Sequence, residues 1–73
     1  MSPEKLTYMS NQIATFFANR PEAEAVHAVA THINDFWEPR MRRQLLEIVA
    51  AGGADLSDLV TMAAPEIRRP APE

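Results

Sequence analysis

The stretch Phe36-Trp37-Glu38-Pro39-Arg40-Met41 marks a corner between two helices. Because Pro39 disfavours helical geometry at the residue before it, a helix that reaches this stretch must end at Glu38. The fixed φ angle of proline suits the first turn of a helix, so Pro39 also begins the next one. Apolar residues recur at helical spacing on both sides of the corner. The stretch therefore predicts two amphipathic helices joined by a tight, proline-fixed turn.

Two apolar stripes precede this corner. The first stripe contains Leu6, Met9, Ile13, Phe16 and Phe17, and the second contains Val26, Val29, Ala30, Ile33, Phe36 and Trp37. Ser2 and Pro3 are typical of the N-cap and the first position of a helix, and Asn19-Arg20-Pro21 separates the two stripes. Because this connection is short, we expect the two helices to pack as an antiparallel hairpin. Phe36 and Trp37 would then lie far from Phe16 and Phe17, which gives two separate aromatic ends.

Two further helices are predicted after the corner. The third helix has the apolar residues Met41, Leu45, Ile48 and Val49, and Gly52-Gly53 ends it. Asp55 suits the N-cap of a short fourth helix with Leu56, Leu59, Val60 and Ala63, which stops at Pro65. The predicted fold class is all-α, a small helical bundle of three helices plus a short C-terminal helix. Residues 1–64 would form a single helical domain, and residues 65–73 would form a flexible tail with almost nothing to bury.

The composition excludes several classes of protein. The chain has 73 residues and no cysteine, so it can form neither a disulfide nor a cysteine-ligated metal or iron–sulfur site. Its formal net charge of −3 argues against a general polyanion-binding protein, and we expect no nucleic-acid partner. No apolar run approaches the ~20 residues that span a bilayer, and the N-terminus lacks the features of a secretory signal. We therefore expect a cytoplasmic protein without a membrane partner.

Catalytic and metal-binding groups do not converge in the sequence. His27 and His32 lie five positions apart, so on a helix they point about 140° away from each other and cannot hold one metal ion. Glu22 and Glu24 fall in the first turn of a helix, where the helix dipole favours carboxylates. We expect no catalytic, cofactor-binding or metal-binding residue and no small-molecule substrate. The chain would act by binding other proteins and would not itself be an enzyme.

Residues of the kind found at protein interfaces gather around the corner. Trp, Tyr, Met and Arg are enriched at such interfaces, and a tryptophan beside a proline turn is hard to bury in so small a chain. Tyr8 and Leu46 fall off the apolar stripes of their helices and leave apolar surface. The predicted partner-binding residues are Phe36, Trp37, Pro39, Arg40, Met41, Arg43, Tyr8 and Leu46.

The arginine cluster at positions 40, 42 and 43 has three interpretations. It can be a solvated face on which Arg43 pairs with Glu47, a nucleic-acid contact, or a contact with an acidic patch of a partner protein. The neighbouring acids Glu38 and Glu47 argue against the nucleic-acid contact.

Trp37 has two possible roles. If its indole is a binding hot spot, Trp37→Ala should weaken association about thirtyfold and disturb the isolated fold less. If it is a core residue, the same substitution should lower the helicity and the thermal stability of the isolated chain. We favour the hot spot, and expect Arg68→Ala in the tail to change neither association nor fold.

Three blocks of the chain resemble one family. They are Lys5-Leu6, then Met9-Ser10-Asn11-Gln12-Ile13-Ala14 with Phe16-Phe17, and then His32 to Met41, which contains the string Phe-Trp-x-Pro-Arg-Met. Over residues 5–62 the sequence is similar to the small delta subunit of bacterial NAD-dependent, molybdenum-containing formate dehydrogenases. The resemblance implies an accessory subunit, without cofactor ligands of its own, in a cytoplasmic complex that oxidises formate to carbon dioxide and reduces NAD⁺.

The resemblance also implies the partners of the chain. In such complexes the large catalytic subunit holds the molybdenum pterin cofactor, and other subunits hold flavin and iron–sulfur clusters. The chain would bind the large catalytic formate dehydrogenase subunit and support the assembly or stability of the complex. The alternatives are a free-standing small helical regulator and a cofactor-insertion chaperone that binds only transiently.

Overall fold

The computed structural model describes residues 1–70, which form four α-helices and a 3₁₀ helix. The elements are α1 (Pro3–Phe17), α2 (Glu22–Phe36), α3 (Pro39–Ala50), α4 (Asp58–Ala63) and the 3₁₀ helix η1 (Ala64–Glu66). No strand occurs within residues 1–70. The predicted all-α class, with three helices followed by a short fourth, is confirmed.

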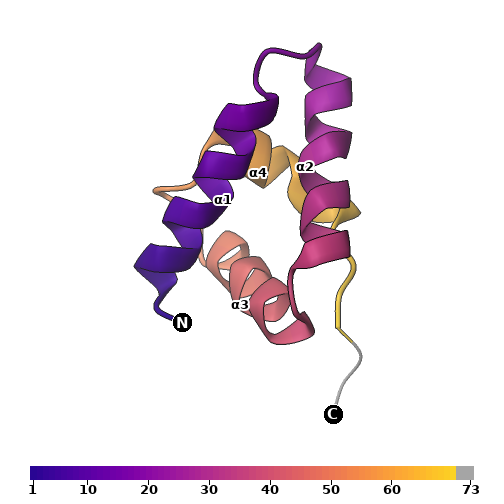
Figure 1. The fold of residues 1–73 in the computed structure, drawn as a ribbon. Coiled ribbons are helices and arrows are strands. Elements are labelled where there is room, and N and C mark those ends of the chain that lie inside the picture. The colour runs from indigo at the N-terminus through magenta and orange to yellow at the C-terminus, as the bar shows by residue number, and fades with distance from the viewer. Residues whose placement is uncertain (71–73) are drawn as a thin grey trace.

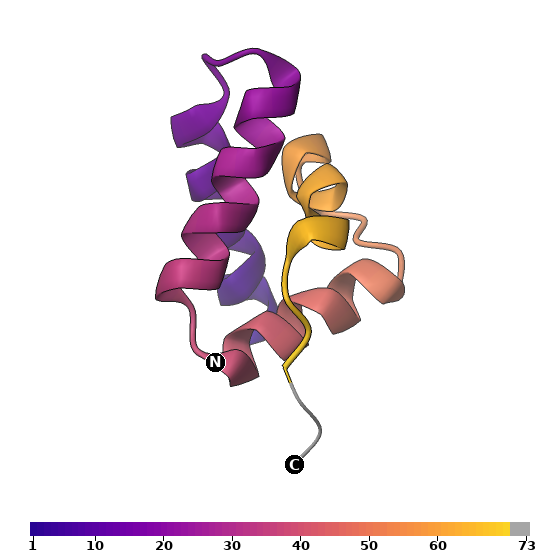
Figure 2. The same ribbon diagram turned by 90° about the vertical axis from the view of Figure 1, so that its right-hand side faces the viewer.

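The helices α1 and α2 form an antiparallel hairpin, as their short connection predicted. Figure 1 shows the chain rising through α1 and returning through α2 beside it. α4 packs against both helices, and α3 crosses the lower end of the hairpin and contacts α1. In Figure 2, α3, α4 and η1 all lie on one side of the hairpin, and no helix of the described chain covers the opposite side. One face of the α1–α2 pair therefore remains open.

A serine cap and two prolines set the helix boundaries near the predicted positions. The Oγ atom of Ser2 accepts a hydrogen bond from the backbone N of Lys5 at 3.2 Å, and Pro3 is the first residue of α1. Pro39 is the first residue of α3, and the two residues before it have extended backbone. The helix α2 therefore ends at Phe36, two residues earlier than predicted.

The predicted glycine stop after α3 is a Schellman motif. The backbone N of Gly53 donates to the carbonyl of Ile48, and that of Gly52 donates to the carbonyl of Val49, both at 3.0 Å. Gly52 has a φ of 116° and Gly53 a φ of 55°, in the left-handed region that favours glycine. This turn sends the chain back toward the hairpin, where α4 packs.

The side-chain amide of Asn11 holds the loop between α3 and α4 against α1. Its Nδ2 atom donates to the carbonyl of Asp55 at 2.9 Å, and its Oδ1 atom accepts from the backbone N of Ser57 at 2.8 Å. The residue at the N-cap of α4 is Ser57, so the prediction of Asp55 was wrong. The reason is that a contact with a distant helix, rather than a local cap, fixes the loop.

The core face of α1 is narrower than its apolar stripe. Leu6, Ser10 and Ala14 are buried on this face, whereas Phe16 is 75% exposed. The small side chains of Ser10 and Ala14 let the neighbouring helices approach closely. The apolar residues at the edge of this face are only partly buried: Met9, Ile13 and Phe17. α1 therefore keeps an apolar edge outside the core.

Trp37 lies in the core, although we expected its indole to be hard to bury. Its side chain is 7% exposed and belongs to the same apolar cluster as Ile33 and Leu45. The extended backbone of Trp37 turns the chain out of α2 toward α3, and the Nη1 atom of Arg42 donates to its carbonyl at 3.0 Å. Phe36, its neighbour, is 75% exposed. The corner thus directs one aromatic side chain inward and leaves the other outside.

The segment after α4 has more buried side-chain surface than its composition predicted. Ile67 is 4% exposed and belongs to the core cluster. The backbone N of Arg68 donates to the Oδ1 atom of Asn34 at 2.8 Å, and its Nη2 atom donates to the carbonyl of Asn34 at 3.2 Å. The guanidinium of Arg68 thus has a hydrogen-bond partner, and the effect of Arg68→Ala stays a prediction. The flexibility of the tail 65–73 stays a prediction, and its residues 71–73 lie outside the described residues.

The burial of Trp37 predicts a large loss of stability on truncation. Trp37→Ala should lower the free energy of unfolding by about 3–5 kcal/mol, because it removes a buried aromatic side chain and leaves a cavity. Phe36→Ala, at the exposed neighbouring position, should cost less than about 1 kcal/mol. Thermal and urea denaturation followed by circular dichroism on both variants measures the difference. Equal stability of the two variants would contradict the assignment of Trp37 to the core.

The contacts of Asn11 predict that its amide stabilises the fold by joining α1 to the loop before α4. Asn11→Leu should lower the free energy of unfolding by about 1–3 kcal/mol, because a backbone N–H and a carbonyl lose their partner. The matched control is Gln12→Leu, since Gln12 bonds only to Tyr8 on the same helix in the described hydrogen bonds. Urea denaturation of the two variants tests this, and a Gln12 variant as destabilised as the Asn11 variant would refute it.

Candidate functional site

The two histidines have different neighbours. The Nδ1 atom of His27 lies 3.0 Å from the Oε1 atom of Glu66, in an exposed contact between α2 and η1. The His32 ring packs instead beside Phe36, with 4.9 Å between ring centroids. No group of three histidine, cysteine, aspartate or glutamate side chains that could hold a metal ion occurs within residues 1–70. The candidate site is the exposed surface around the His32 ring.

Four ring side chains form a continuous row across the open face of the hairpin. The ring centroids of Phe16 and Phe17 are 5.0 Å apart, those of Phe17 and His32 are 6.3 Å apart, and His32 then contacts Phe36. The ring contacts between the two expected aromatic ends run through His32, which lies between Phe17 and Phe36. We call Phe16, Phe17, His32 and Phe36 the aromatic row.

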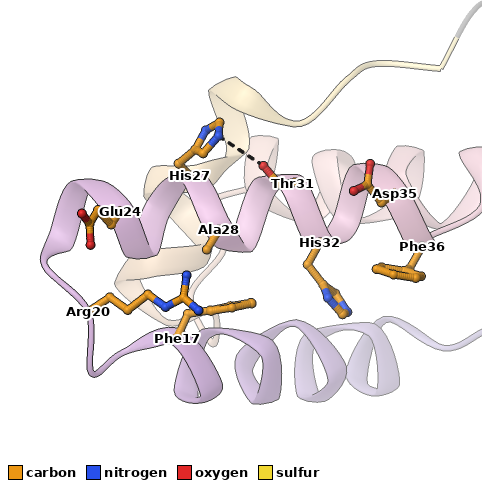
Figure 3. Close-up of a pocket in the computed structure, with 9 residues that line it drawn as sticks. All are labelled: Phe17, Arg20, Glu24, His27, Ala28, Thr31, His32, Asp35 and Phe36. Carbon is orange, nitrogen blue, oxygen red and sulfur yellow. Dashed lines mark hydrogen bonds between the residues drawn. The ribbon is translucent and has the colours of Figure 1, made fainter.

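An open groove runs along α2 beside the aromatic row. Figure 3 shows the side chain of His32 pointing from α2 toward α1, with Phe36 on one side of it and the Phe17 ring on the other. The groove has a volume of about 620 Å³, and a smaller hollow of about 280 Å³ adjoins it on the α1 side. The groove is lined by Phe17, Arg20, Glu24, His27, Ala28, Thr31, His32, Asp35 and Phe36. Phe17 and His32 border both hollows and join them into one surface.

Charged side chains frame this groove. The guanidinium of Arg20 lies over the Phe17 ring, 4.9 Å from its centroid, in a cation–π contact at one end. Glu24 and Asp35 line the α2 side. With two carboxylates against one guanidinium, the rim of the groove carries net negative charge.

The predicted partner-binding residues fall into three places. Phe36, Pro39 and Arg40 are exposed at the corner between α2 and α3, and Met41 beside them is half-buried. Tyr8 is exposed but borders a different hollow, which Ala51 and Gly53 at the far end of α3 also line. The half-buried Arg43 and Leu46 border a third hollow, together with Arg69 and Pro70. Trp37 lies beneath the corner in the core.

Part of the exposed aromatic surface was not predicted from the sequence. Phe16 and Phe17 were both placed on the apolar stripe of the first helix, but adjacent helical residues point about 100° apart, and Phe16 is 75% exposed. Arg42 was predicted only as one member of a basic cluster. The Nη1 atom of Arg42 binds the carbonyl of Trp37, and its Nε atom donates to the carbonyl of Arg68 at 3.1 Å. Arg42 thus joins the corner to the last described segment of the chain.

The fold and the aromatic row define the chain as a small all-α protein with an exposed aromatic surface. A family model described as NADH-dependent formate dehydrogenase delta subunit FdsD matches residues 5–64, and the chain belongs to this family. The resemblance drawn from the sequence is thereby confirmed. Searches of curated proteins and of solved structures gave no match.

The matched region contains the parts of the molecule described above. Residues 5–64 include nearly all of α1 and the whole of α2, α3 and α4, and with them the aromatic row and the corner at Pro39. None of the helices within residues 1–70 is long and apolar enough to cross a membrane.

The hydrogen bonds of Arg42 predict that it differs from its exposed neighbour Arg40. Arg42→Ala should lower the free energy of unfolding by about 1–2 kcal/mol, because two backbone carbonyls lose a charged donor. Arg40→Ala should change it by no more than about 0.5 kcal/mol. Urea denaturation of the isolated variants measures both values. If the two substitutions cost the same, Arg42 does not brace the corner.

Proposed function

We propose that this chain is a non-catalytic subunit of a cytoplasmic, NAD-dependent formate dehydrogenase, which binds the large catalytic subunit and supports its assembly or stability. The observation that carries the proposal is the match of residues 5–64 to the delta-subunit family. Formate oxidation and NAD⁺ reduction are then carried out by the partner subunits.

The side-chain chemistry of the chain supports a non-catalytic role. Molybdenum pterin, flavin and iron–sulfur cofactors are expected in the partner subunits from the family context alone. The chain has no cysteine to bind a cluster. Within residues 1–70, the polar side chains of Asn11, Asn34 and Arg42 hold helices and loops together through hydrogen bonds.

The exposed surface supports a role in binding. Phe36 is held at a rigid proline corner together with Pro39 and Arg40, and such a corner orders interface groups at low entropic cost. Trp37 supports this surface from beneath, as a core residue. Because the hydrophobic core of a 73-residue chain supplies only a few kcal/mol, association with a large partner also stabilises the subunit.

The proposal predicts that the chain stays with the enzyme during purification. When the full complex is expressed with an affinity tag on this chain, the large catalytic subunit should elute with it in constant ratio through gel filtration. Deleting the chain should lower the amount of assembled, active complex. A chain that is needed for activity but leaves the complex in gel filtration would be a transient chaperone and would refute the permanent-subunit proposal. A chain that never associates would be a free-standing protein.

A further inference from the structure

We infer that the groove along α2, together with the aromatic row at its α1 edge, binds one amphipathic helix of the partner subunit, with apolar side chains on the aromatic row and basic side chains toward Glu24 and Asp35. The inference rests on the proposed function, because it assigns the partner surface to a formate dehydrogenase subunit. It goes further in naming the face that docks and the chemistry of what docks there.

The shape of the groove suits a helix. Glu24, Ala28, Thr31 and Asp35 recur at spacings of four, three and four residues, so they form one strip along α2. Ala28 and Thr31 at the middle of the strip are small, which allows a second backbone to approach closely. The strip is about 16 Å long at the helical rise of 1.5 Å per residue, which corresponds to about three turns of a docked helix.

The aromatic row supplies the apolar contact area. Phe16 and Phe36 are each 75% exposed in the described chain, although phenylalanine gains most when its large side chain is buried. The Phe16 ring contacts Phe17, and the Phe36 ring contacts His32, so the exposed rings belong to one continuous surface. An apolar helix face laid in such a groove is a recurring mode of recognition between proteins.

The last described residues of the chain do not lie in the groove. Arg69 and Pro70 border a hollow of α3 with Arg43 and Leu46. Figure 2 shows this end of the described chain leaving the molecule beyond α3, away from the hairpin's upper part.

A second copy of the chain is disfavoured by charge. In a two-fold dimer the same patch meets itself, so the net negative rim of Glu24, Asp35 and Arg20 would face an equally negative rim. The whole chain also carries a formal charge of −3. A helix with lysine or arginine beside its apolar face meets both the apolar row and the two carboxylates, and we therefore assign the groove to a basic-flanked helix of another protein.

The experiment compares binding of variants to the tagged formate dehydrogenase complex that lacks this chain. Phe16→Ala and Phe36→Ala should each weaken binding about thirtyfold, as loss of an aromatic hot spot does. The double variant Glu24→Gln/Asp35→Asn should weaken it by roughly two- to tenfold and reduce its dependence on salt. The matched control is Met62→Ala, which truncates an apolar side chain exposed on α4, outside the groove. Circular dichroism melting shows whether each variant remains folded.

The outcomes separate this inference from the proposed function. If the unaltered chain does not bind the complex, both fail. If it binds and Phe16→Ala binds equally well, the groove is not the docking face, although the proposed function stands. Dimerisation of the isolated chain that Phe36→Ala abolishes would assign the groove to a second copy and overturn the inference.

A cross-linking readout tests the chemistry of the partner independently of the affinity. A photo-reactive amino acid in place of Phe16 should cross-link, within the complex, to a helical segment of the partner that carries lysine or arginine beside apolar residues. Cross-links that map to an acidic or extended segment would overturn the assignment, even if Phe16→Ala weakens binding.

Discussion

The backbone turn before Pro39 is the constraint on which the rest of the structure depends. Pro39 excludes helical geometry at Glu38, so α2 stops and the chain passes through two extended residues before α3 begins. This turn places the Trp37 indole in the core and sets α3 across the end of the hairpin. Arg42 then binds the carbonyl of Trp37 from the first turns of α3 and holds the carbonyl of Arg68 as well. The corner thereby fixes the position of the chain's last described segment.

Local signals were sufficient to predict the helices, and long-range contacts account for what they missed. Serine caps, prolines and the glycine pair act within a few residues, so the order of the helices followed from the sequence. The N-cap of α4 could not be predicted in this way, because the loop before it is fixed by Asn11, more than forty residues away. The packing of Ile67 and Arg68 depends in the same way on Asn34 of α2. Composition suggested a tail with nothing to bury, since it cannot show that one isoleucine meets a core made by other helices.

In the candidate site too, local patterns predicted some features and long-range packing decided the others. Residue type drew attention to the corner, where Phe36 and Arg40 are exposed, and their role in binding stays a prediction. Residue type could not tell which of two adjacent aromatic residues is buried, because a turn of the backbone decides that between Phe36 and Trp37. Nor could it join the aromatic ends of the two helices, since His32 was considered only as a possible metal ligand. The row exists because His32 lies between Phe17 and Phe36 once the helices pack.

The surplus of apolar side chains on one face follows from the size of the protein. Only one side of the hairpin can be covered by α3 and the short α4, so the apolar edge of α1 and Phe36 of α2 remain outside. Exposed apolar patches mark interaction sites or are a liability for aggregation. Under the proposed function the partner subunit buries these side chains, and its binding free energy adds to the small stability of the isolated chain. Trp37 and Phe36 are thus neighbours with different environments. The buried Trp37 packs in the core beneath the corner, and the exposed Phe36 lies on its surface.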